Sequence, residues 1–291
     1  MEQTRNSYVV ITPARNEAAG IEDTILHMAA QTIRPLQWVI VNDGSKDETG
    51  RILDDYSKKY YWITVVHRPD RGFRSPGGGV IEAFMVGYRS LLSTGWEYIV
   101  KFDADLSPEA DYFERCLKVF QSESKLGVGG GSVYHMADGN AVIEANPSFH
   151  VRGATKIYRK ACWEALEGLL AAPGWDTLDE VKANMLGWQT HTFTDIRVLQ
   201  RRPTGSNDGA WRDCVKNGRA DYICGYHPIY MVVKSAKRLL QKPFVTGSLG
   251  HLWGFVSAYW QGVSQVNDAA LIAYLRQQQL RRIFGLKTIW T

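Results

Sequence analysis

The sequence lacks any apolar run of the roughly 18–20 residues that a membrane-spanning helix needs. Its first residues, MEQTRNSYVV, also lack the basic segment and apolar stretch of a secretory signal peptide. Cysteine is scarce, and the four cysteines form no CxxC pair, so the sequence indicates reduced thiols rather than a zinc framework. We therefore expect a cytoplasmic protein.

A strong charge of either sign is absent as well. The 34 Lys and Arg residues against 30 Asp and Glu give a net charge of +4, too small to indicate nucleic-acid binding but compatible with anionic ligands or a membrane surface. The 291 residues, of which 45% are hydrophobic, suffice for a sizeable core. With no internal repeat, we expect one domain over residues 1–240 and a helical C-terminal extension over residues 241–291.

Short β-branched apolar segments alternate with amphipathic segments over the first hundred residues. Apolar segments that are nearly continuous are typical of strands buried on both faces. The alternation predicts an α/β fold with a mixed, mainly parallel sheet and helices on both faces. We expect strands at residues 8–12 (ended by Pro13), 38–42, 63–67, 98–102, 127–133 and 192–198, and helices at residues 21–31, 48–60, 81–93, 156–170 and 179–186.

Polar clusters follow three of these expected strands, at residues 13–17, 42–47 and 103–105. Ligands of such sheets bind outside the carboxyl ends of the strands, so we expect the three clusters to share one rim. Asp103 and Asp105, spaced i and i+2, could both face a hard cation such as Mg²⁺ or Mn²⁺, although a solvated turn is the simpler alternative. Asp43 could accept a hydrogen bond from a base or a ribose hydroxyl, whereas Asp47 is expected to cap the next helix.

A glycine-rich loop, RGFRSPGGGV, precedes the helix expected at residues 81–93. Backbone N–H groups at the start of a helix can face an anion. Arg71 and Arg74 are therefore candidates for binding a diphosphate or a nucleotide, and a flexible surface loop is the alternative.

The segments VVITPARNE, VIVNDGSKDET and YIVKFDADL together resemble the inverting glycosyltransferases of family 2, whose shared GT-A fold is a Rossmann-like, nucleotide-sugar-binding domain. The resemblance covers roughly residues 8–203. It implies an enzyme that moves one sugar from a nucleoside-diphosphate sugar, of the UDP, GDP or dTDP type, to an acceptor hydroxyl or a lipid phosphate in glycan or polysaccharide biosynthesis.

The resemblance also implies roles for single residues. Asp43 would read the nucleotide base, Asp103 would lie near the ribose and the metal, and Asp105 would bind the metal that bridges the diphosphate. The implied cofactor is a divalent metal, Mg²⁺ or Mn²⁺. Substrate contacts are implied for the first turn and for two further positions: Pro13, Ala14, Arg15, Glu17, Ala104 and Gly153.

An inverting transfer to a hydroxyl needs a general base. The family's aspartate lies about eleven residues before a Gly-aromatic pair, which here is Gly187-Trp188 and points to Asp176. Trp175 stands where the family usually has glutamate, so Asp179 is kept as a second candidate and Glu180 as a third, and one of them could instead be a helix N-cap. Trp175 could provide an aromatic platform for a sugar ring or could be a core residue.

The segment after the last expected strand, Gln200-Arg201-Arg202, lacks the tryptophan of the Gln-x-x-Arg-Trp motif of processive synthases. This absence, with that of transmembrane helices, favours transfer of a single sugar. Arg201 and Arg202 could bind the diphosphate. Lone histidines are more often structural than metal ligands, and this is expected of His191, His227 and His251.

The stretch LGHLWGFVSAYW, residues 249–260, is either a packed helix or an interfacial helix at a membrane surface. The basic residues that follow, between Arg276 and Lys287, favour the second interpretation, with a lipid-linked acceptor and a position on the inner face of the membrane. A soluble glycan is the alternative acceptor.

Two rival functions differ in their motifs. A nucleotidyltransferase that makes nucleotide sugars would need a glycine-rich phosphate loop after the first strand, which PARNEAAG lacks. An inactive nucleotide-sugar-binding module would not need the intact Asp103/Asp105 pair.

Overall fold

The structure is a computed structural model that describes residues 6–72, 77–137, 139–143, 147, 149–201, 209–239 and 244–290. Within these residues nine strands form one sheet in the order β3-β2-β1-β4-β8-β6-β9-β5, with β7 paired to β6. The strands are β1 (Tyr8–Ala14), β2 (Gln37–Asp43), β3 (Ile63–Arg68), β4 (Tyr98–Phe102), β5 (Leu106–Pro108), β6 (Leu126–Ala137), β7 (Asn140–Ile143), β8 (Thr155–Arg159) and β9 (Gln189–Gln200).

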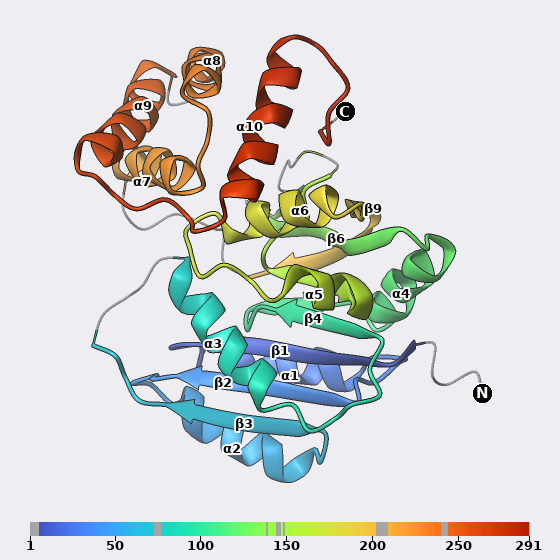
Figure 1. Cartoon of the computed structure of the whole chain (residues 1–291). Helices are drawn as coiled ribbons and strands as arrows, with labels where there is room; N and C mark the ends of the chain where they lie inside the picture. The colour runs from blue at the N-terminus through green and yellow to red at the C-terminus, as the bar shows by residue number, and fades with distance from the viewer. Residues whose placement is uncertain are drawn as a thin grey trace.

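Helices cover both faces of this sheet and form a further layer beyond it (Figure 1). They are α1 (Ile21–Ala29), α2 (Thr49–Lys59), α3 (Gly78–Arg89), α4 (Tyr112–Ser122), α5 (Lys160–Leu166), α6 (Trp175–Met185), α7 (Ala210–Ile223), α8 (Pro228–Arg238), α9 (Phe244–Trp260) and α10 (Ala269–Ile283). None of the helices in the described part of the chain is long and apolar enough to cross a membrane.

The first four strands form a parallel sheet whose residues alternate between two cores. Val10 and Ile40 pack in one core with residues of α1 and α4. Val9 and Ile11 pack in the other core with residues of α3 and α5. Period-two alternation sends successive side chains to opposite faces, so a strand buried on both sides must be apolar throughout. The predicted mixed, mainly parallel sheet with helices on both faces is confirmed.

β1 continues through Pro13 to Ala14, so the prediction that Pro13 ends the strand was wrong. β4 pairs with β1 only as far as Ile11. From Thr12 to Ala14, β1 pairs with β2 on one side and not with β4 on the other. Proline lacks an N–H and is tolerated where one side of a strand is unpaired.

Residues 155–159 form strand β8, so the helix predicted at residues 156–170 was wrong at its start; the helix there, α5, is short. α6 begins at Trp175, four residues before the start predicted at 179. Trp175 and Asp176 therefore lie in the first turn of a helix.

The glycine run of β6 permits close approach of backbones. A Cβ atom on Gly130 would lie 2.1 Å from the carbonyl oxygen of Thr155 in β8. The pairing of β6 with β9 shifts register between Gly131 and Ser132, which marks an irregularity in the strand.

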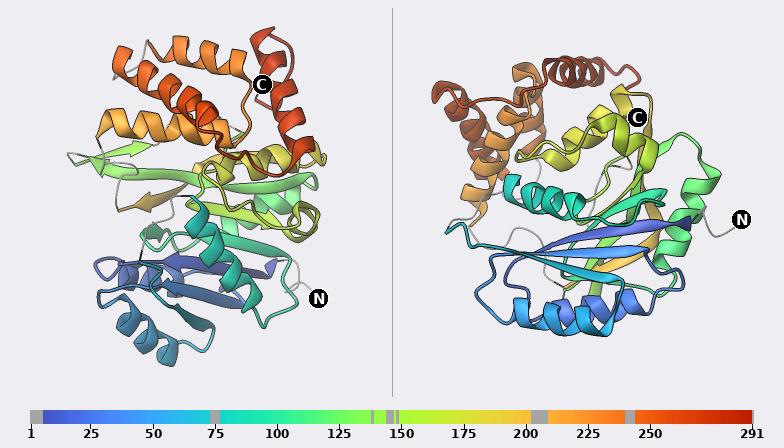
Figure 2. Two further views of the ribbon diagram at one scale, coloured as in Figure 1. Left: turned by 60° about the vertical axis from the view of Figure 1, so that its left-hand side comes forward. Right: turned by 60° about the horizontal axis from the view of Figure 1, so that its bottom comes forward.

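Helices α7 to α10 form a layer on the far side of the molecule from α2, as both views of Figure 2 show. α7 and α9 pack backbone to backbone, since a Cβ on Gly218 would lie 1.9 Å from the His251 carbonyl oxygen. α10 packs on α6 through Leu271 and Leu275. Residues 244–290, the described part of the expected extension, thus contact both the preceding helices and α6.

Substitution of Gly130 tests the close approach of β6 and β8. Gly130→Ala should lower the free energy of unfolding by about 1–3 kcal/mol or more, because the clashing atom belongs to a backbone that cannot move aside. Gly95→Ala is the matched control, because a Cβ there would meet nothing within 4 Å. Urea unfolding of the two variants measures the difference, and equal midpoints would contradict the packing described.

Candidate active site

The first two polar clusters meet at one edge of the sheet. The Arg15 guanidinium donates to the Asp43 carbonyl oxygen at 3.0 Å, and Asn16 N–H donates to Ser45 Oγ at 3.0 Å. Glu17 N–H donates to Thr49 Oγ1 at 2.8 Å. These contacts follow from the parallel register, which places Ala14 beside Asn42. Asp47 accepts from Thr49 N–H at 3.1 Å, and the N-cap position of α2 is occupied by the next residue, Glu48.

The third cluster is joined to the same edge through α1. Ala104 is buried, and its carbonyl oxygen accepts from the Thr24 hydroxyl of α1 at 2.9 Å. Pro13 and Ala14 end the neighbouring strand β1. The three strand ends predicted to share one rim therefore lie together, at the end toward which the arrows of β2 and β3 point in Figure 1.

Asp43 is nearly buried, and two guanidinium groups cover its carboxylate. Arg68 contacts Oδ1 at 2.7 Å and Arg71 contacts Oδ2. Arg71 also pairs with Glu82 at 3.0 Å. Arg74, the other predicted cation of this loop, lies outside the described residues.

Sequence reasoning missed Arg68, the last residue of β3, and Asp70, which follows that strand. Asp70 pairs with Lys46 at 2.9 Å and with Arg15 at 2.7 Å, and the hydrogen bond from Lys46 is foremost in holding the Asp70 pKa well below its usual range. Applying to β3 the strand-end argument used for its neighbours would have found both residues.

Asp103 and Asp105 present oxygen ligands at the end of β4. The Asp103 carboxylate is 29% exposed and contacts the buried ammonium of Lys101. Asp105 is buried, and the side-chain amide of Gln200 lies 3.3 Å from its carboxylate. No group of three or more His, Cys, Asp or Glu side chains converges anywhere in the part of the chain that the structure describes. Mg²⁺ is usually held by one or two carboxylates with substrate phosphates, so this donor pair fits such an ion.

The Arg201 side chain binds residues of α1. Its guanidinium contacts Asp23 at 2.6 Å and the Thr24 hydroxyl at 2.8 Å. Arg202 lies outside the described residues.

A buried ammonium, that of Lys156 in β8, holds the start of α6. Its Nζ donates to the Asp176 carbonyl oxygen at 2.5 Å and to the Asp179 carboxylate at 2.7 Å, and it lies 2.9 Å from Glu180 Oε1. An ammonium has three N–H donors, which matches these three residues. Lys156 thus fixes the turn of α6 that carries Asp176.

The same cluster reaches the loop before β8. Glu180 accepts from Val151 N–H at 2.7 Å and lies 3.0 Å from His150 Nδ1. Tyr158 donates its hydroxyl to Asp179 at 2.5 Å. Sequence reasoning missed Lys156 and His150, because the first was assigned to a helix and neither lies near its partners in sequence.

Asp179 is unsuited to act as a base despite a raised pKa. Burial is the largest cause of the rise, and the charge of Lys156 opposes it. Its side chain is only 2% exposed, and its oxygens are taken by Lys156, Tyr158 and the Glu180 N–H. Glu180 is buried as well. Geometry excludes an acceptor from either carboxylate.

Asp176 is half-buried and lies over Gly153. A Cβ on Gly153 would lie 3.3 Å from Asp176 Oδ2 and 2.9 Å from the Trp175 ring. The next residue, Ala154, accepts from Asp103 N–H at 2.9 Å. Asp176, Gly153 and the Asp103 turn therefore adjoin one another.

Trp175 is buried, with the ammonium groups of Lys101 and Lys156 at 5.5 Å and 5.4 Å from its ring centroid. Cation–π contacts of this kind fix a ring in place. The arrangement favours the core tryptophan over the sugar platform.

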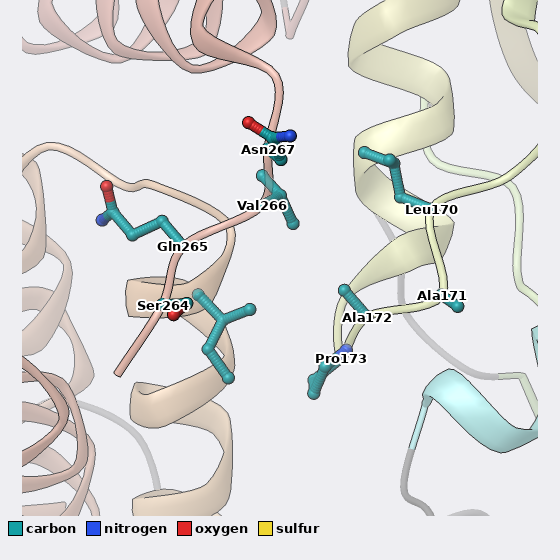
Figure 3. Close-up of a pocket in the computed structure, with 9 residues that line it drawn as sticks. Leu170, Ala171, Ala172, Pro173, Ser264, Gln265, Val266 and Asn267 are labelled. Atoms are coloured by element: carbon teal, nitrogen blue, oxygen red, sulfur yellow. The ribbon is translucent and has the colours of Figure 1, made fainter. Parts of the chain in front are cut away.

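A cavity of about 320 Å³ lies beyond Trp175, between the loop before α6 and the helical layer (Figure 3). Val266 and Asn267 lie on one side of it, and Leu170 and Pro173 lie on the other. Its lining contains none of the carboxylates of the rim. The three predicted structural histidines lie elsewhere: His251 is buried against Asp221, His227 caps α8, and His191 lies 3.8 Å from Glu123.

Comparison with known proteins identifies the family to which the chain belongs. The model of the family described as Glycosyl transferase family 2 matches residues 9–166. An uncharacterized glycosyltransferase of Bacillus subtilis, EpsJ, is 34% identical over 125 residues, 43% of this chain and 33% of that protein. A dolichyl-phosphate beta-glucosyltransferase of Dictyostelium discoideum is 27% identical over 145 residues, 46% of this chain and 42% of that protein. The matched region is thus under half the length of these relatives.

Solved structures show the same fold. A mannosyltransferase from Pyrobaculum calidifontis, in complex with GDP-Man and Mn²⁺, has a TM-score of 0.57 and 17% identity, covering 96% of this chain and 81% of that one. Residues 1–349 of S. aureus TarS, in complex with UDP-GlcNAc, have a TM-score of 0.55 and 18% identity, covering 96% and 80%. The fold is GT-A, as the motif resemblance implied.

The buried cluster predicts a pH dependence of stability. Burial lowers the pKa of His150, but the charge and hydrogen bond of Glu180 outweigh it, so the pKa is raised above 6.5. A raised histidine pKa stabilises the fold fully below the unfolded value and loses that contribution as pH rises through the folded value. The free energy of unfolding should therefore decline between about pH 6 and 8, and less so in His150→Gln.

Thr192→Val is the matched control for this measurement. It removes a hydrogen bond to the His150 carbonyl oxygen, at 2.5 Å, without removing a titrating group. It should lower stability equally at every pH in chemical denaturation. Identical slopes for wild type and His150→Gln would show that the histidine proton is not linked to folding.

Proposed function

Because the chain belongs to glycosyl transferase family 2, we propose that it is an inverting glycosyltransferase that transfers a single sugar from a nucleoside-diphosphate sugar in glycan or polysaccharide biosynthesis. The observation that carries the proposal is the rim itself. A carboxylate held by two arginines, a pair of oxygen ligands and a half-buried aspartate lie along it in the order that nucleotide, diphosphate and sugar would need.

The nucleotide would bind where β1, β2 and β3 end. Pro13 and Ala14 at the end of β1, with Arg15 and Glu17 just after it, would border this position, and Asp43 would accept a hydrogen bond from the base. An incoming base N–H would take an Asp43 oxygen now bound by a guanidinium. Arg71, released from that oxygen, is the cation that we assign to the diphosphate.

Asp103 and Asp105 would hold the divalent metal, Mg²⁺ or Mn²⁺. When bound, the metal supplies positive charge that stabilises the diphosphate leaving group. The structural relative in complex with GDP-Man and Mn²⁺ supports the use of a divalent metal.

Asp176 is the general base of this proposal. It would take the proton of an acceptor hydroxyl as the oxygen attacks the sugar carbon on the face opposite the nucleotide. Lys156 binds the main-chain carbonyl of Asp176 and leaves its carboxylate available. If the acceptor is a lipid phosphate, it is already ionised, and Asp176 would orient it rather than deprotonate it.

We place the protein in the cytoplasm, at the inner face of the membrane, with a glycan or a lipid-linked acceptor. The dolichyl-phosphate glucosyltransferase among the relatives supports a lipid acceptor. The aromatic and basic residues of the C-terminal segment support contact with the membrane surface.

Donor binding tests the proposal directly. Thermal unfolding with Mn²⁺ and UDP, GDP or dTDP, alone and as nucleotide sugars, should show one nucleotide that raises the stability by about 2.7 kcal/mol at a hundred times its dissociation constant. Asp43→Asn and Asp105→Asn should each remove most of this gain, the second together with its dependence on Mn²⁺.

Asp55→Asn, on the exposed surface of α2, is the control and should keep the gain. If no nucleoside diphosphate stabilises the protein with Mn²⁺, or if Asp105→Asn keeps the full metal-dependent shift, the proposal is wrong.

Substitution of two aspartates of α6 tests which of them is the general base. With the donor found in the screen and a hydroxyl acceptor, Asp176→Asn should lower kcat by about 10²–10⁴-fold, with donor affinity and stability little changed. Asp179→Asn should lower the thermal midpoint but keep kcat within about tenfold, because its carboxylate is buried against Lys156. The reverse pattern in nucleotide-release kinetics would assign the base to Asp179.

A further inference from the structure

An apolar face covers the outer side of α8 and α9. We define it by six side chains, each between 52% and 71% exposed. Two belong to α8 and four to α9: Ile229, Val232, Val245, Leu249, Trp253 and Trp260. On α9 these residues recur at intervals of four and seven, which places them along one side of the helix. Large exposed apolar patches mark interaction sites.

The packing of α9 against α7 turns this side outward. Gly250 and Gly254 lie on the buried side, where a Cβ on Gly254 would come 2.1 Å from the Val215 carbonyl oxygen. Residues 244–260 contain no Asp, Glu, Lys or Arg. A surface helix that faces water normally carries charged residues on its outer side, and α9 carries none.

Charge is distributed unevenly between this layer and the rest of the chain. Residues 209–291 contain eleven Lys and Arg against three Asp, a net charge of +8, whereas residues 1–208 carry −4. Several of these cations lie in α8 or in α7, which packs on α9. Arg219 binds the side chain of Gln261, which follows Trp260, and Lys237 and Arg238 end α8. Trp211, beside Arg212, packs on α9 at Gly250.

We propose that the apolar face docks on the surface of an anionic lipid membrane. Tryptophan is favoured at the headgroup level, and each nearby cation adds attraction to anionic lipids. With 17 residues, α9 is about 25 Å long at 1.5 Å per residue, shorter than the hydrocarbon core, so it lies in the interface. A second copy of the chain is a poorer occupant, because two layers of +8 repel each other.

Docking would bring the active site close to the lipid. The thiol of Cys224, at the end of α7, donates to the Pro173 carbonyl oxygen at 3.2 Å, two residues before Trp175. Figure 1 shows α7 to α9 above the edge at which β2 and β3 end. A membrane-embedded acceptor could thus reach Asp176 without leaving the bilayer; this last step rests on the proposed glycosyl transfer, whereas the docking itself does not.

Vesicle flotation of the full chain tests the docking. Wild type should float with vesicles of phosphatidylcholine and 30% phosphatidylglycerol, bind phosphatidylcholine alone at least tenfold more weakly, and dissociate in part at high salt. Leu249→Ser combined with Trp253→Ser should lower the binding to anionic vesicles at least tenfold. Arg212→Gln combined with Lys237→Gln should lower it and weaken the salt dependence.

Tyr61→Ser combined with Leu92→Ser is the matched control. These residues are 91% and 82% exposed but lie outside the helical layer, so their loss should leave flotation unchanged. If the wild-type protein does not float with anionic vesicles, the proposal is wrong. A dimer in light scattering that Leu249→Ser/Trp253→Ser converts to a monomer also overturns it, since the face would then bind a second copy.

Nucleotide-induced stabilisation, measured on the same variants, separates the two proposals. It should be unchanged in Leu249→Ser/Trp253→Ser, which also shows that this variant is folded. Loss of nucleotide binding in every protein with flotation intact would reject the transferase and keep the docking.

Discussion

The active-site geometry depends on the burial of one ammonium group. Lys156 is fully buried in β8, where an unpaired charge would cost several kcal/mol. Its three donors meet three residues of the first turns of α6, so the helix cannot turn or slide without leaving a buried charge unpaired. Two carboxylates share this cation. Burial is the largest cause of the raised pKa of Asp179, and the neighbouring charge of Glu180 adds to it. Burial lowers the pKa of Lys156 and of His150, but the nearby carboxylates outweigh this effect, so both pKa values are raised.

Hydrogen bonds connect the Lys156 cluster to the rest of the rim. Glu180 holds the Val151 amide, so the loop that ends in Gly153 is tied to the same helix. Ala154 then accepts the amide hydrogen of Asp103. Lys101, in β4, is a second buried lysine of the site. Its ammonium and that of Lys156 both lie near the Trp175 ring. The proposed base and the proposed metal-binding pair, carried by different elements, are thereby held in fixed relative positions before any substrate binds.

The sequence alone was sufficient for the parallel half of the fold and for the three strand ends. Parallel strands align their carboxyl ends, and the apolar segments mark where each strand stops, so local patterns determine which polar residues meet. Arg68 and Asp70 obey the same rule. Lys156 does not, because a lysine beside Tyr158 and Lys160 has the pattern of an amphipathic helix, and its carboxylate partners lie more than 20 residues away. Which of Asp176 and Asp179 stays accessible depends on where α6 begins, and a long-range ion pair holds that start.

The helical layer joins the same frame from the other side. Gly174 leaves room for the Cys224 thiol, since a Cβ there would lie 2.6 Å from it, and α10 packs on α6 through Leu271. The glycines that let α7 lie against α9 also force the large side chains of α9 outward. Close packing inside the layer and an apolar outer face are thus two results of one sequence pattern. The first turn of α6 is held by Lys156 beneath and by the layer above, so whatever surface the layer meets, Asp176 keeps a fixed position relative to it.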